Sequence, residues 1–436
     1  MPTPEPFCLV YAEEVSPRLT YITDVIWNKQ ASVTNDVDRF QNFRGERLQY
    51  TRKKIWPEIL HIQAEELLFQ QNIIPIRITV AEWESTPVFF SGNGDIPFDW
   101  LAASFYLISR YEEYLPFQPD QYERFPVQAS LAHRFDFLHK PLVQIWTALL
   151  RRKFQLFSLP EMPEEPIIQL TFDMDELFQF RHLPLGRQLK RLLGNFLRMD
   201  FEQVVMQLKV LSGNAPDPYD LWQGNWNGLE AMSKKPIFFF SGAGKVGGMD
   251  RQLPVDHKAV TEILHRCDQK AMVGWHPSWA SSNHPVLLQK ELDSVQSAAK
   301  RSINKSRFHY LRFQLPHSYH RLLELGIEHE YSMGYGNTFG FRASFADAFP
   351  WFDLSKNEPT SLVIHPFFYM DAIPVFQSKE NPAAALTYID NIREQGRGVV
   401  QELCLVFHPH ALAKASWREL LASLSEDANI RLHLHQ

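Results

Sequence analysis

The stretch IIQLTFDMDE, residues 167–176, decides the fold, because an apolar run ends there in closely spaced acids. In an extended chain, side chains two residues apart point to the same face, so the carboxylates of Asp173 and Asp175 lie close together. Like charges at that spacing repel each other unless a cation lies between them. The stretch therefore predicts a buried strand that ends in a site for a cation or for proton transfer.

The pattern after this stretch alternates short apolar runs with helical ones. Repeated strand and helix units are typical of an α/β protein with a parallel sheet or barrel. We expect strands at IIQLTF (167–172), PIFFF (236–240), AMVGW (271–275), FHYLRF (308–313), SLVIH (361–365) and LCLVF (403–407). We expect helices at 259–269, 285–301 and 317–326.

Residue types that carry chemistry follow these predicted strands. In parallel sheets and barrels, functional residues gather at the carboxyl ends of the strands. The residues expected there are Asp173, Asp175, His276, His309, Arg312, His365 and His408. Imidazole and carboxylate together are the usual ligands of a zinc-like divalent cation, and a histidine in a cleft can serve as a general acid.

The segment SLPEMPEEP, 158–166, predicts a domain boundary, since its prolines remove backbone donors and its acids keep it solvated. We predict a smaller α/β domain at 1–158, without a catalytic site, and a second domain at 159–436. The first has strand-like runs FCLVYA (7–12), IPIRITV (74–80) and PVFFSG (87–92), with helices at 98–115 and 140–154.

Composition narrows the classes of partner and compartment. The net charge of −6 argues against nucleic acid as the main partner, since no basic excess can replace its counterions. The three cysteines form no CxxC pair, which favours a reducing compartment. A secretory signal is not visible at the N-terminus, and no apolar run reaches the length of a membrane span. We expect a cytoplasmic protein.

Two other segments each have an ordinary and a functional interpretation. SGAGKVGGMD, 241–250, follows a strand like a phosphate-binding loop, but Val246 stands where that motif requires Ser or Thr. A flexible loop is the better interpretation. The stretch 187–211 is amphipathic with a partly basic face. We expect a helix packed over the rim of the barrel, with a membrane-surface helix as the alternative.

The second half of the chain resembles the polysaccharide deacetylase family, of the carbohydrate esterase family 4 type. The likeness rests on the order of short motifs: TFDMD with its two acids, GWHPSWAS, HYLRF, GFRAS and LVFH. The stretches SRFHYLRFQLP and GFRAS are similar to a bacterial branch, and SRYEEYLPFQPDQYERFPVQASLA is similar to the N-terminal region that accompanies it. This resemblance implies a distorted (β/α) barrel preceded by a smaller α/β domain.

The resemblance also implies a function and a set of roles. The chain would be a metal-dependent hydrolase that removes an acyl group, in particular acetyl, from an N-acylated sugar or a small amide. Asp173 would be the catalytic base and His408 the general acid, with Arg312 or Arg342 orienting the base. A divalent cation, zinc first, would bind Asp175 and His276, with His309 or solvent as the third ligand.

One position departs from the family's pattern. A second histidine usually follows the first by four residues, and that position here is Ala280, with His284 displaced by a further turn. This departure supports one alternative, a degenerate relative that binds a glycan or other ligand without catalysis. The lack of a visible secretory signal makes a second alternative plausible, a different metal-dependent hydrolase acting on a non-sugar amide.

Overall fold

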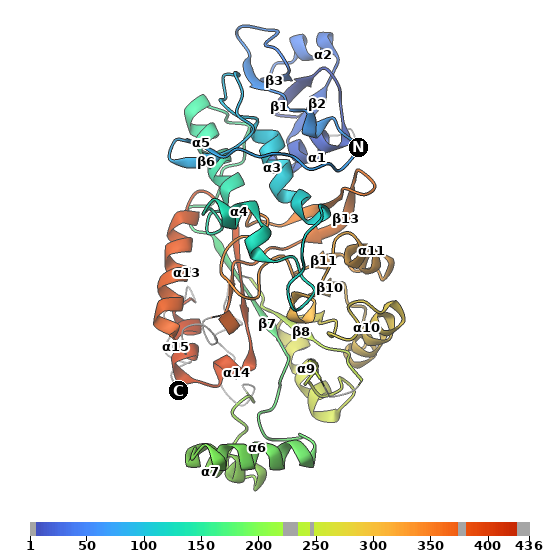
Figure 1. Ribbon diagram of the computed structural model, residues 1–436, viewed down its shortest axis with the longest axis vertical. Helices are drawn as coiled ribbons and strands as arrows, with labels where there is room; N and C mark the ends of the chain where they lie inside the picture. Colours follow the sequence, from blue (N-terminus) through green and yellow to red (C-terminus); the bar gives the residue numbers. More distant parts are fainter. Residues whose placement is uncertain (1–5, 221–233, 245–247, 374–380, 425–436) are drawn as a thin grey trace. The chain divides into compact units, whose positions relative to one another are not determined.

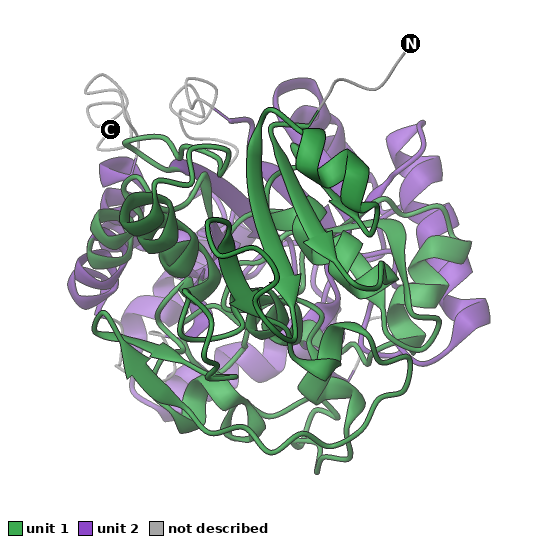
Figure 2. Ribbon diagram, turned by 90° about the horizontal axis from the view of Figure 1, so that it is seen from above, with its two compact units in different colours: residues 1–166, 311–368, 391–403 green, residues 167–310, 369–390, 404–436 purple. Residues whose placement is uncertain are grey.

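The computed structural model describes residues 6–220, 234–244, 248–373 and 381–424. The chain divides into two compact units (Figure 2). Unit 1 comprises residues 1–166, 311–368 and 391–403, and unit 2 comprises residues 167–310, 369–390 and 404–436. Segments far apart in the sequence therefore belong to one unit. The division into domains 1–158 and 159–436 stays a prediction.

Unit 1 contains a four-stranded parallel sheet with the strand order β2-β1-β3-β4. All five residues of its central strand β1, CLVYA, are buried, as expected for a strand covered on both faces. Its strands are β1 (Cys8–Ala12), β2 (Ala31–Thr34), β3 (Glu46–Thr51) and β4 (Leu60–Gln63), and β5 (Ala81–Trp83) pairs with β6 (Thr86–Val88). Its N-terminal helices are α1 (Pro17–Ile26), α2 (Val37–Asn42), α3 (Trp100–Ile108), α4 (Leu131–Arg134) and α5 (Leu142–Phe154).

The later segment of unit 1 contributes three more strands and a helix. Strand β13 (Glu358–Ile364) pairs antiparallel with β12 (Phe349–Asp353) and parallel with β11 (His329–Glu330), and α11 spans His317–Glu324. Short 3₁₀ helices in unit 1 span Glu66–Leu68, Tyr111–Tyr114 and Val127–Ala129.

Unit 2 is built on a row of strands in the order β10-β9-β8-β7-β15-β14, whose registered pairs are parallel. The strands are β7 (Ile167–Asp173), β8 (Ile237–Phe240), β9 (Met272–Trp275), β10 (Lys305–Ser306), β14 (Tyr369–Met370) and β15 (Glu402–Phe407). The helices are α6 (Leu185–Leu197), α7 (Phe201–Leu211), α9 (Lys258–Lys270), α10 (Pro285–Ala299), α14 (Pro409–Leu412) and α15 (Ala415–Ser423) (Figure 1). Helix α13 (Pro382–Gly396), like β15, contains residues of both units.

The core of unit 2 explains why these strands pair. Every residue of β8 is buried, and the rings of Phe172 and Phe238 stack with their centroids 4.7 Å apart across the β7–β8 pair. Because parallel strands end at the same edge of a sheet, their carboxyl ends form a common platform. The described strands show a mixed α/β fold, and no closed barrel is seen among them.

Most predicted strands agree with the structure, two do not, and only the first two residues of PVFFSG (87–92) lie in a strand. Residues 74–80, IPIRITV, lie outside any strand. The run FHYLRF, 308–313, forms a 3₁₀ turn at His309–Leu311, and both Tyr310 and Leu311 have positive φ, at 58° and 54°. Left-handed backbone cannot continue a strand, so the alternation of apolar residues was misleading here.

Candidate functional site

The carboxyl ends of the parallel strands of unit 2 carry a group of polar side chains. Asp173 is the last residue of β7, and His276, Arg307 and His408 directly follow β9, β10 and β15. Backbone hydrogen bonds hold these positions: the His276 N–H donates to the carbonyl of Phe240 at 2.8 Å. The platform predicted from the strand pattern is therefore present, although His309 reaches it from a turn.

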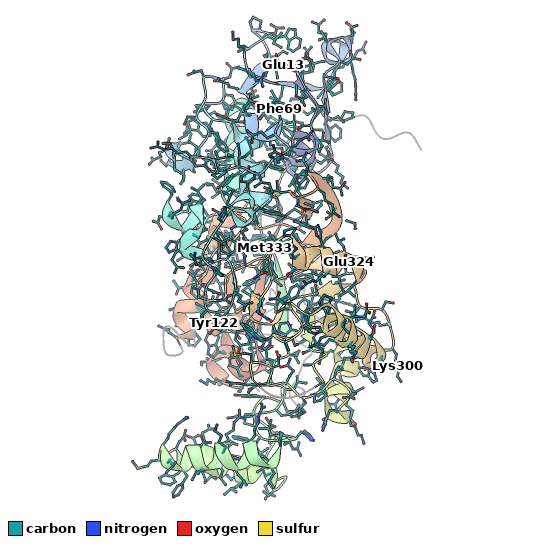
Figure 3. All side chains as sticks on the ribbon, turned by 45° about the vertical axis from the view of Figure 1, so that its right-hand side comes forward. Glu13, Phe69, Tyr122, Lys300, Glu324 and Met333 are labelled. Carbon is teal, nitrogen blue, oxygen red and sulfur yellow. The ribbon has the colours of Figure 1, made fainter. Side chains whose placement is uncertain are left out.

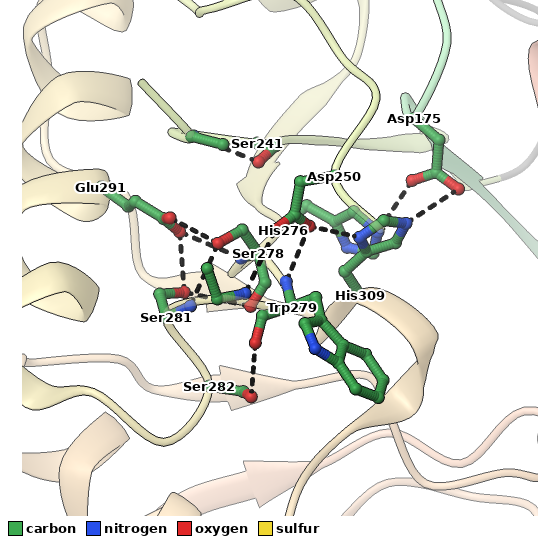
Figure 4. A network of polar contacts seen from close by, with 12 residues as sticks. Asp175, Ser241, Asp250, His276, Ser278, Trp279, Ser281, Ser282, Glu291 and His309 are labelled. Carbon is green, nitrogen blue, oxygen red and sulfur yellow. Dashed lines mark hydrogen bonds and ion pairs between the residues drawn. The ribbon is translucent and has the colours of Figure 1, made fainter. Parts of the chain in front are cut away.

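Asp175, His276 and His309 bring their ligand atoms within 4.8 Å of one another (Figure 4). His276 Nε2 lies 3.0 Å from Asp175 Oδ1, and His309 Nε2 lies 3.6 Å from Asp175 Oδ2. Both imidazoles are buried, while the Asp175 side chain is 24% exposed. The triad is thus held inside unit 2 and reached from solvent on the side of Asp175.

Hydrogen bonds at the far ring nitrogens fix the direction of both imidazoles. His276 Nδ1 lies 2.5 Å from the carbonyl of Arg307, and His309 Nδ1 lies 2.9 Å from Asp250 Oδ1. Because a carbonyl and a carboxylate oxygen accept, each Nδ1 is the donor and each Nε2 faces Asp175. Ligand histidines in metal sites are oriented in this way.

Asp250 also fixes the loop that follows β9. Its carboxylate accepts hydrogen bonds from the backbone N–H groups of Trp279 at 2.8 Å and Ala280 at 3.1 Å. Ala280 occupies the position at which the family resemblance would place a histidine. The second ligand nitrogen of the triad comes instead from His309, and His284 caps the N-terminus of α10.

A buried carboxylate of α10 accepts hydrogen bonds from the same loop. Glu291 of α10 accepts from the Ser278 N–H at 2.9 Å, from Ser278 Oγ at 2.5 Å and from Ser281 Oγ at 2.8 Å (Figure 4). Burial raises the pKa of Glu291, and these hydrogen bonds oppose that rise. The segment behind His276 is therefore connected to α10 at three points.

Asp175 and His309 stabilise each other's charged form. Burial opposes ionisation of Asp175, but the imidazoles of His309 and His276 beside it hold its pKa well below the usual range. Burial likewise lowers the pKa of His309, but Asp175 and Asp250 outweigh it and raise this pKa to about 10. In the metal-free protein a proton on His309 thus supplies the positive charge that the carboxylates require.

The donor set fits a divalent cation of the zinc type. Asp175 Oδ1 is buried and makes no hydrogen bond within the described part of the chain, although it lies 3.0 Å from His276 Nε2. An oxygen and a nitrogen that approach without hydrogen-bond geometry are arranged as two ligands around a common position. One carboxylate and two imidazoles are typical protein ligands of zinc and related ions.

Asp173 is paired with Arg307. Arg307 Nη1 donates to Asp173 Oδ1 at 2.8 Å, and the guanidinium lies 4.7 Å from the centroid of the Phe239 ring. Arg307 is fully buried and Asp173 is 3% exposed. The ion pair holds one carboxylate oxygen, while the other, Oδ2, lies 4.0 Å from His408 Nε2.

His408 forms a buried pair with Asp371, which directly follows β14. His408 Nδ1 lies 2.5 Å from Asp371 Oδ1, and the His408 backbone N–H donates to Asp371 Oδ2 at 2.7 Å. Its Nε2 lies 3.6 Å from Asp175 Oδ2. Burial opposes the charged form, but Asp371 outweighs it and raises the pKa of His408 to about 9.

The structure changes the assignment of the arginines. Arg312 follows the 3₁₀ turn and pairs with Glu123 at 2.5 Å, and Arg342 pairs with Glu113 at 2.6 Å. All four of these residues belong to unit 1. Since FHYLRF is a turn and not a strand, Arg312 does not end a strand of the platform, and the arginine that contacts Asp173 is Arg307.

Three residues around the site were not predicted from the sequence. Arg307 directly precedes the run FHYLRF, and a strand ending at Ser306 would have placed it on the platform. Asp371 follows the apolar run FFYM, a short strand that was not predicted, and Asp250 ends the glycine-rich loop that was interpreted only as flexible.

Comparisons with known proteins give two distant likenesses. Residues 8–158 match a family of unknown function, DUF7033. No curated protein matches the chain. A solved structure from Mycobacterium smegmatis, provisionally named a polysaccharide deacetylase, is 13% identical, with 62% of this chain and 90% of that chain covered and a TM-score of 0.37. A likeness this distant supports no conclusion about function, which must come from the side chains of the site.

Within the described residues, no helix is long and apolar enough to cross a membrane.

Proposed function

We propose that the chain is a metal-dependent hydrolase that removes an acyl group from an N-acylated sugar or a related amide. The observation that carries the proposal is the convergence of the Asp175–His276–His309 triad with the ion-paired Asp173 and with His408. Zinc is the first candidate for the metal, given these ligands. The barrel implied by the family resemblance belongs to the same proposal.

Each side chain has a defined part in amide hydrolysis. A divalent cation held by Asp175, His276 and His309 would polarise the substrate carbonyl and lower the pKa of water. Asp173 takes the proton of the attacking water at Oδ2, because Arg307 holds Oδ1. His408 donates its Nε2 proton to the leaving amine.

The elevated pKa of His408 suits this role. A general acid must be protonated before the amine leaves, and Asp371 keeps His408 charged at neutral pH. The same carboxylate accepts hydrogen bonds from the backbone N–H and from Nδ1 of His408, so that Nε2 faces Asp173 and Asp175. Asp371 is therefore a positioning residue for the acid.

Two aromatic side chains next to the triad support a sugar as substrate. Trp279 and Tyr310 are half-buried, and their rings meet edge to face with centroids 5.6 Å apart. Tyr310 in turn lies 4.4 Å from the ring of His309. Aromatic faces that combine apolar surface with a polar atom are suited to the apolar side of a pyranose ring.

The non-catalytic alternative loses its main argument. It rested on Ala280 in place of a histidine, and His309 provides the nitrogen that the triad needs. A hydrolase acting on a small non-sugar amide uses the same residues, and only the substrate test separates it from the sugar hydrolase.

The direct test is acyl release by the zinc-loaded chain. We expect acetate from N-acetylated oligosaccharides, and an Asp173→Asn variant that binds zinc normally but is slower by on the order of 10²–10⁴. Trp279→Ala should raise KM for the oligosaccharide and leave turnover of a small acetamide unchanged. Zinc-loaded protein that releases no acyl group from either class of amide would contradict the proposal.

A further inference from the structure

The segment 185–211, formed by α6 and α7, concentrates exposed apolar surface. Eighteen large apolar side chains are exposed in the described part of the chain, and ten of them lie in this one segment. Scattered exposed apolar residues are normal on a soluble protein, whereas a concentration of this kind marks an interaction surface. We call residues 185–211 the helical hairpin.

Helix α6 turns its apolar stripe outward. Leu185, Leu189, Leu193, Phe196 and Leu197 recur at helical spacing and are 56–71% exposed. None of the 13 residues of α6 is buried. The expectation of a helix packed over the rim by its apolar face is therefore wrong, because such packing would bury these side chains.

The polar edge of α6 makes its contacts with the rest of unit 2. Arg187 Nη1 donates to the carbonyl of Arg251 at 3.2 Å, and Arg191 Nη2 lies 3.6 Å from Glu176 Oε2. At 100° per residue, these arginines lie on the side of the helix roughly opposite the leucines. The helix is thus attached by its charged side, and its apolar side faces away from those contacts.

Helix α7 extends the same apolar surface. Phe201, Val205 and Leu208 are exposed by 56%, 49% and 52%. The rings of Phe196 and Phe201 meet edge to face at 6.0 Å, which joins the faces of the two helices. The helices lie side by side in Figure 1, and their side chains are drawn on the green ribbon in Figure 3.

The charge of the hairpin differs in sign from that of the whole chain. Residues 185–211 contain five basic and two acidic residues, whereas the chain carries −6. Lys190 and Lys209 are exposed and flank the apolar faces of α6 and α7. Long basic side chains beside an apolar stripe can reach lipid headgroups while the stripe enters the acyl region.

We propose that the helical hairpin binds the surface of an anionic lipid bilayer, with α6 and α7 lying in the interface plane. The apolar faces and flanking lysines provide the two contributions on which such binding depends, buried apolar area and attraction to anionic headgroups. A second copy of the chain is a poorer occupant, because a symmetric contact would place two hairpins of like net charge together. This proposal does not depend on the proposed hydrolase function.

Co-sedimentation of the full chain with vesicles tests the proposal. With vesicles of equal parts phosphatidylcholine and phosphatidylglycerol, we expect the wild type to bind and the triple variant Leu189→Ser, Leu193→Ser, Phe196→Ser to bind at least about tenfold more weakly. Val286→Ser is the matched control, since Val286 is 62% exposed on α10, outside the hairpin, and should bind like wild type.

Two lysine variants test the contribution of charge to vesicle binding. Lys190→Gln and Lys209→Gln should each weaken binding by about fivefold, and high salt should weaken the wild type. Equal binding to vesicles of phosphatidylcholine alone would overturn the choice of an anionic surface. Three results would overturn the proposal: no binding by wild type, dimers of the wild type that form with concentration and are lost in the triple variant, and a clear fall in the Tm of the triple variant. A fall in Tm would mean that the apolar face is covered within the chain.

Discussion

Asp173 and the arginine beside it provide the sharpest prediction at the scale of single residues. Arg307→Lys keeps the charge but loses the planar fork that holds Asp173 Oδ1, so kcat should fall by about tenfold or more with KM unchanged. Arg312→Lys makes the same chemical change at the arginine that pairs with Glu123 and should stay within about twofold of wild type. Steady-state kinetics of the zinc-loaded variants test this prediction. A larger fall in kcat for Arg312→Lys than for Arg307→Lys would restore Arg312 as the partner of Asp173.

The proton on His309 predicts that metal binding depends on pH. The pKa of His309 is raised from 6.5 to about 10 in the metal-free protein, so below pH 10 a cation must displace this proton. The apparent zinc affinity should therefore rise by about tenfold per pH unit between about pH 6 and pH 8. The charged form stabilises the metal-free fold fully below pH 6.5, and this contribution is lost as the pH rises through about 10.

A variant of Asp250 checks the cause of that pH dependence. Asp250→Asn removes one of the two carboxylates that raise the pKa of His309. The apparent zinc affinity should therefore stop rising with pH at a lower pH than in the wild type. Zinc competition titrations at several pH values measure both slopes. An affinity that does not change with pH would mean that His309 is neutral before the metal binds.

At the scale of elements, the loop after β8 makes a close contact with α10. A Cβ at Gly242 would lie 2.1 Å from the carbonyl oxygen of Glu291, whereas no atom of the described residues lies within 4 Å of a Cβ at Gly244. Gly242→Ala should therefore destabilise the fold by about 1–3 kcal/mol, and Gly244→Ala by less than about 0.5 kcal/mol. Chemical unfolding of both variants compares them, and equal stabilities would show that α10 can move freely.

The first glycine of SGAGKVGGMD thus has a packing role. Because α10 also carries Glu291, which holds Ser278 and Ser281 behind His276, Gly242→Ala should weaken zinc binding as well. Loss of stability without any change in zinc affinity would separate the helix from the site.

The strand pattern predicted most of the platform because buried parallel strands have a strong apolar signature. Asp173, Asp175, His276 and His408 follow such runs, and their placement depends only on where each strand ends. The turn at Tyr310 and Leu311 could not be predicted, since nothing in the run FHYLRF announces two residues with positive φ. That turn decided which arginine reaches Asp173.

Short strands and polar partners carry weaker signals. Strand β14 has two residues, and a pair of residues shows no periodicity from which Asp371 could be placed at a strand end. Asp250 contacts His309 across a large sequence separation, which only the folded chain brings about. The residues of the triad were predictable one by one, but Asp250, which orients His309, and Asp371, which orients His408, were not.

At the scale of the whole molecule, the two units are not successive segments of the chain. Residues 311–368 and 391–403 belong with the N-terminal 166 residues, so the linker-like segment 158–166 marks only one of several crossings. Proline and acidic residues signal exposure along the sequence, whereas the later crossings lie within ordinary structure such as α13 and β15. Composition therefore gives no signal for these later crossings.

The buried ion pair of Arg342 predicts a structural role within unit 1. Arg342 and Glu113 are both fully or nearly fully buried, and Glu113 also accepts from Arg110 Nε at 2.7 Å. Arg342→Met should cost about 3–5 kcal/mol of unfolding free energy, because it removes a partner from a buried charge. The exposed Arg152→Met should cost less than about 0.5 kcal/mol.

Unfolding in urea measures this cost, and zinc binding provides a second reading. The folded Arg342→Met variant should bind zinc as wild type does, since Arg342 belongs to unit 1 and the triad to unit 2. A variant of normal stability that loses catalysis would instead return Arg342 to the active site.

A calorimetric titration of the purified chain with zinc tests the central claim, that the triad binds a divalent cation, most directly. We predict one equivalent of zinc bound by wild type and by Asp173→Asn, with binding weakened by at least about tenfold in Asp175→Asn, His276→Gln and His309→Gln. His284→Gln, at the exposed N-terminus of α10, is the matched control and should bind like wild type. Absence of binding at millimolar zinc, or binding that survives all three triad substitutions, would contradict the account.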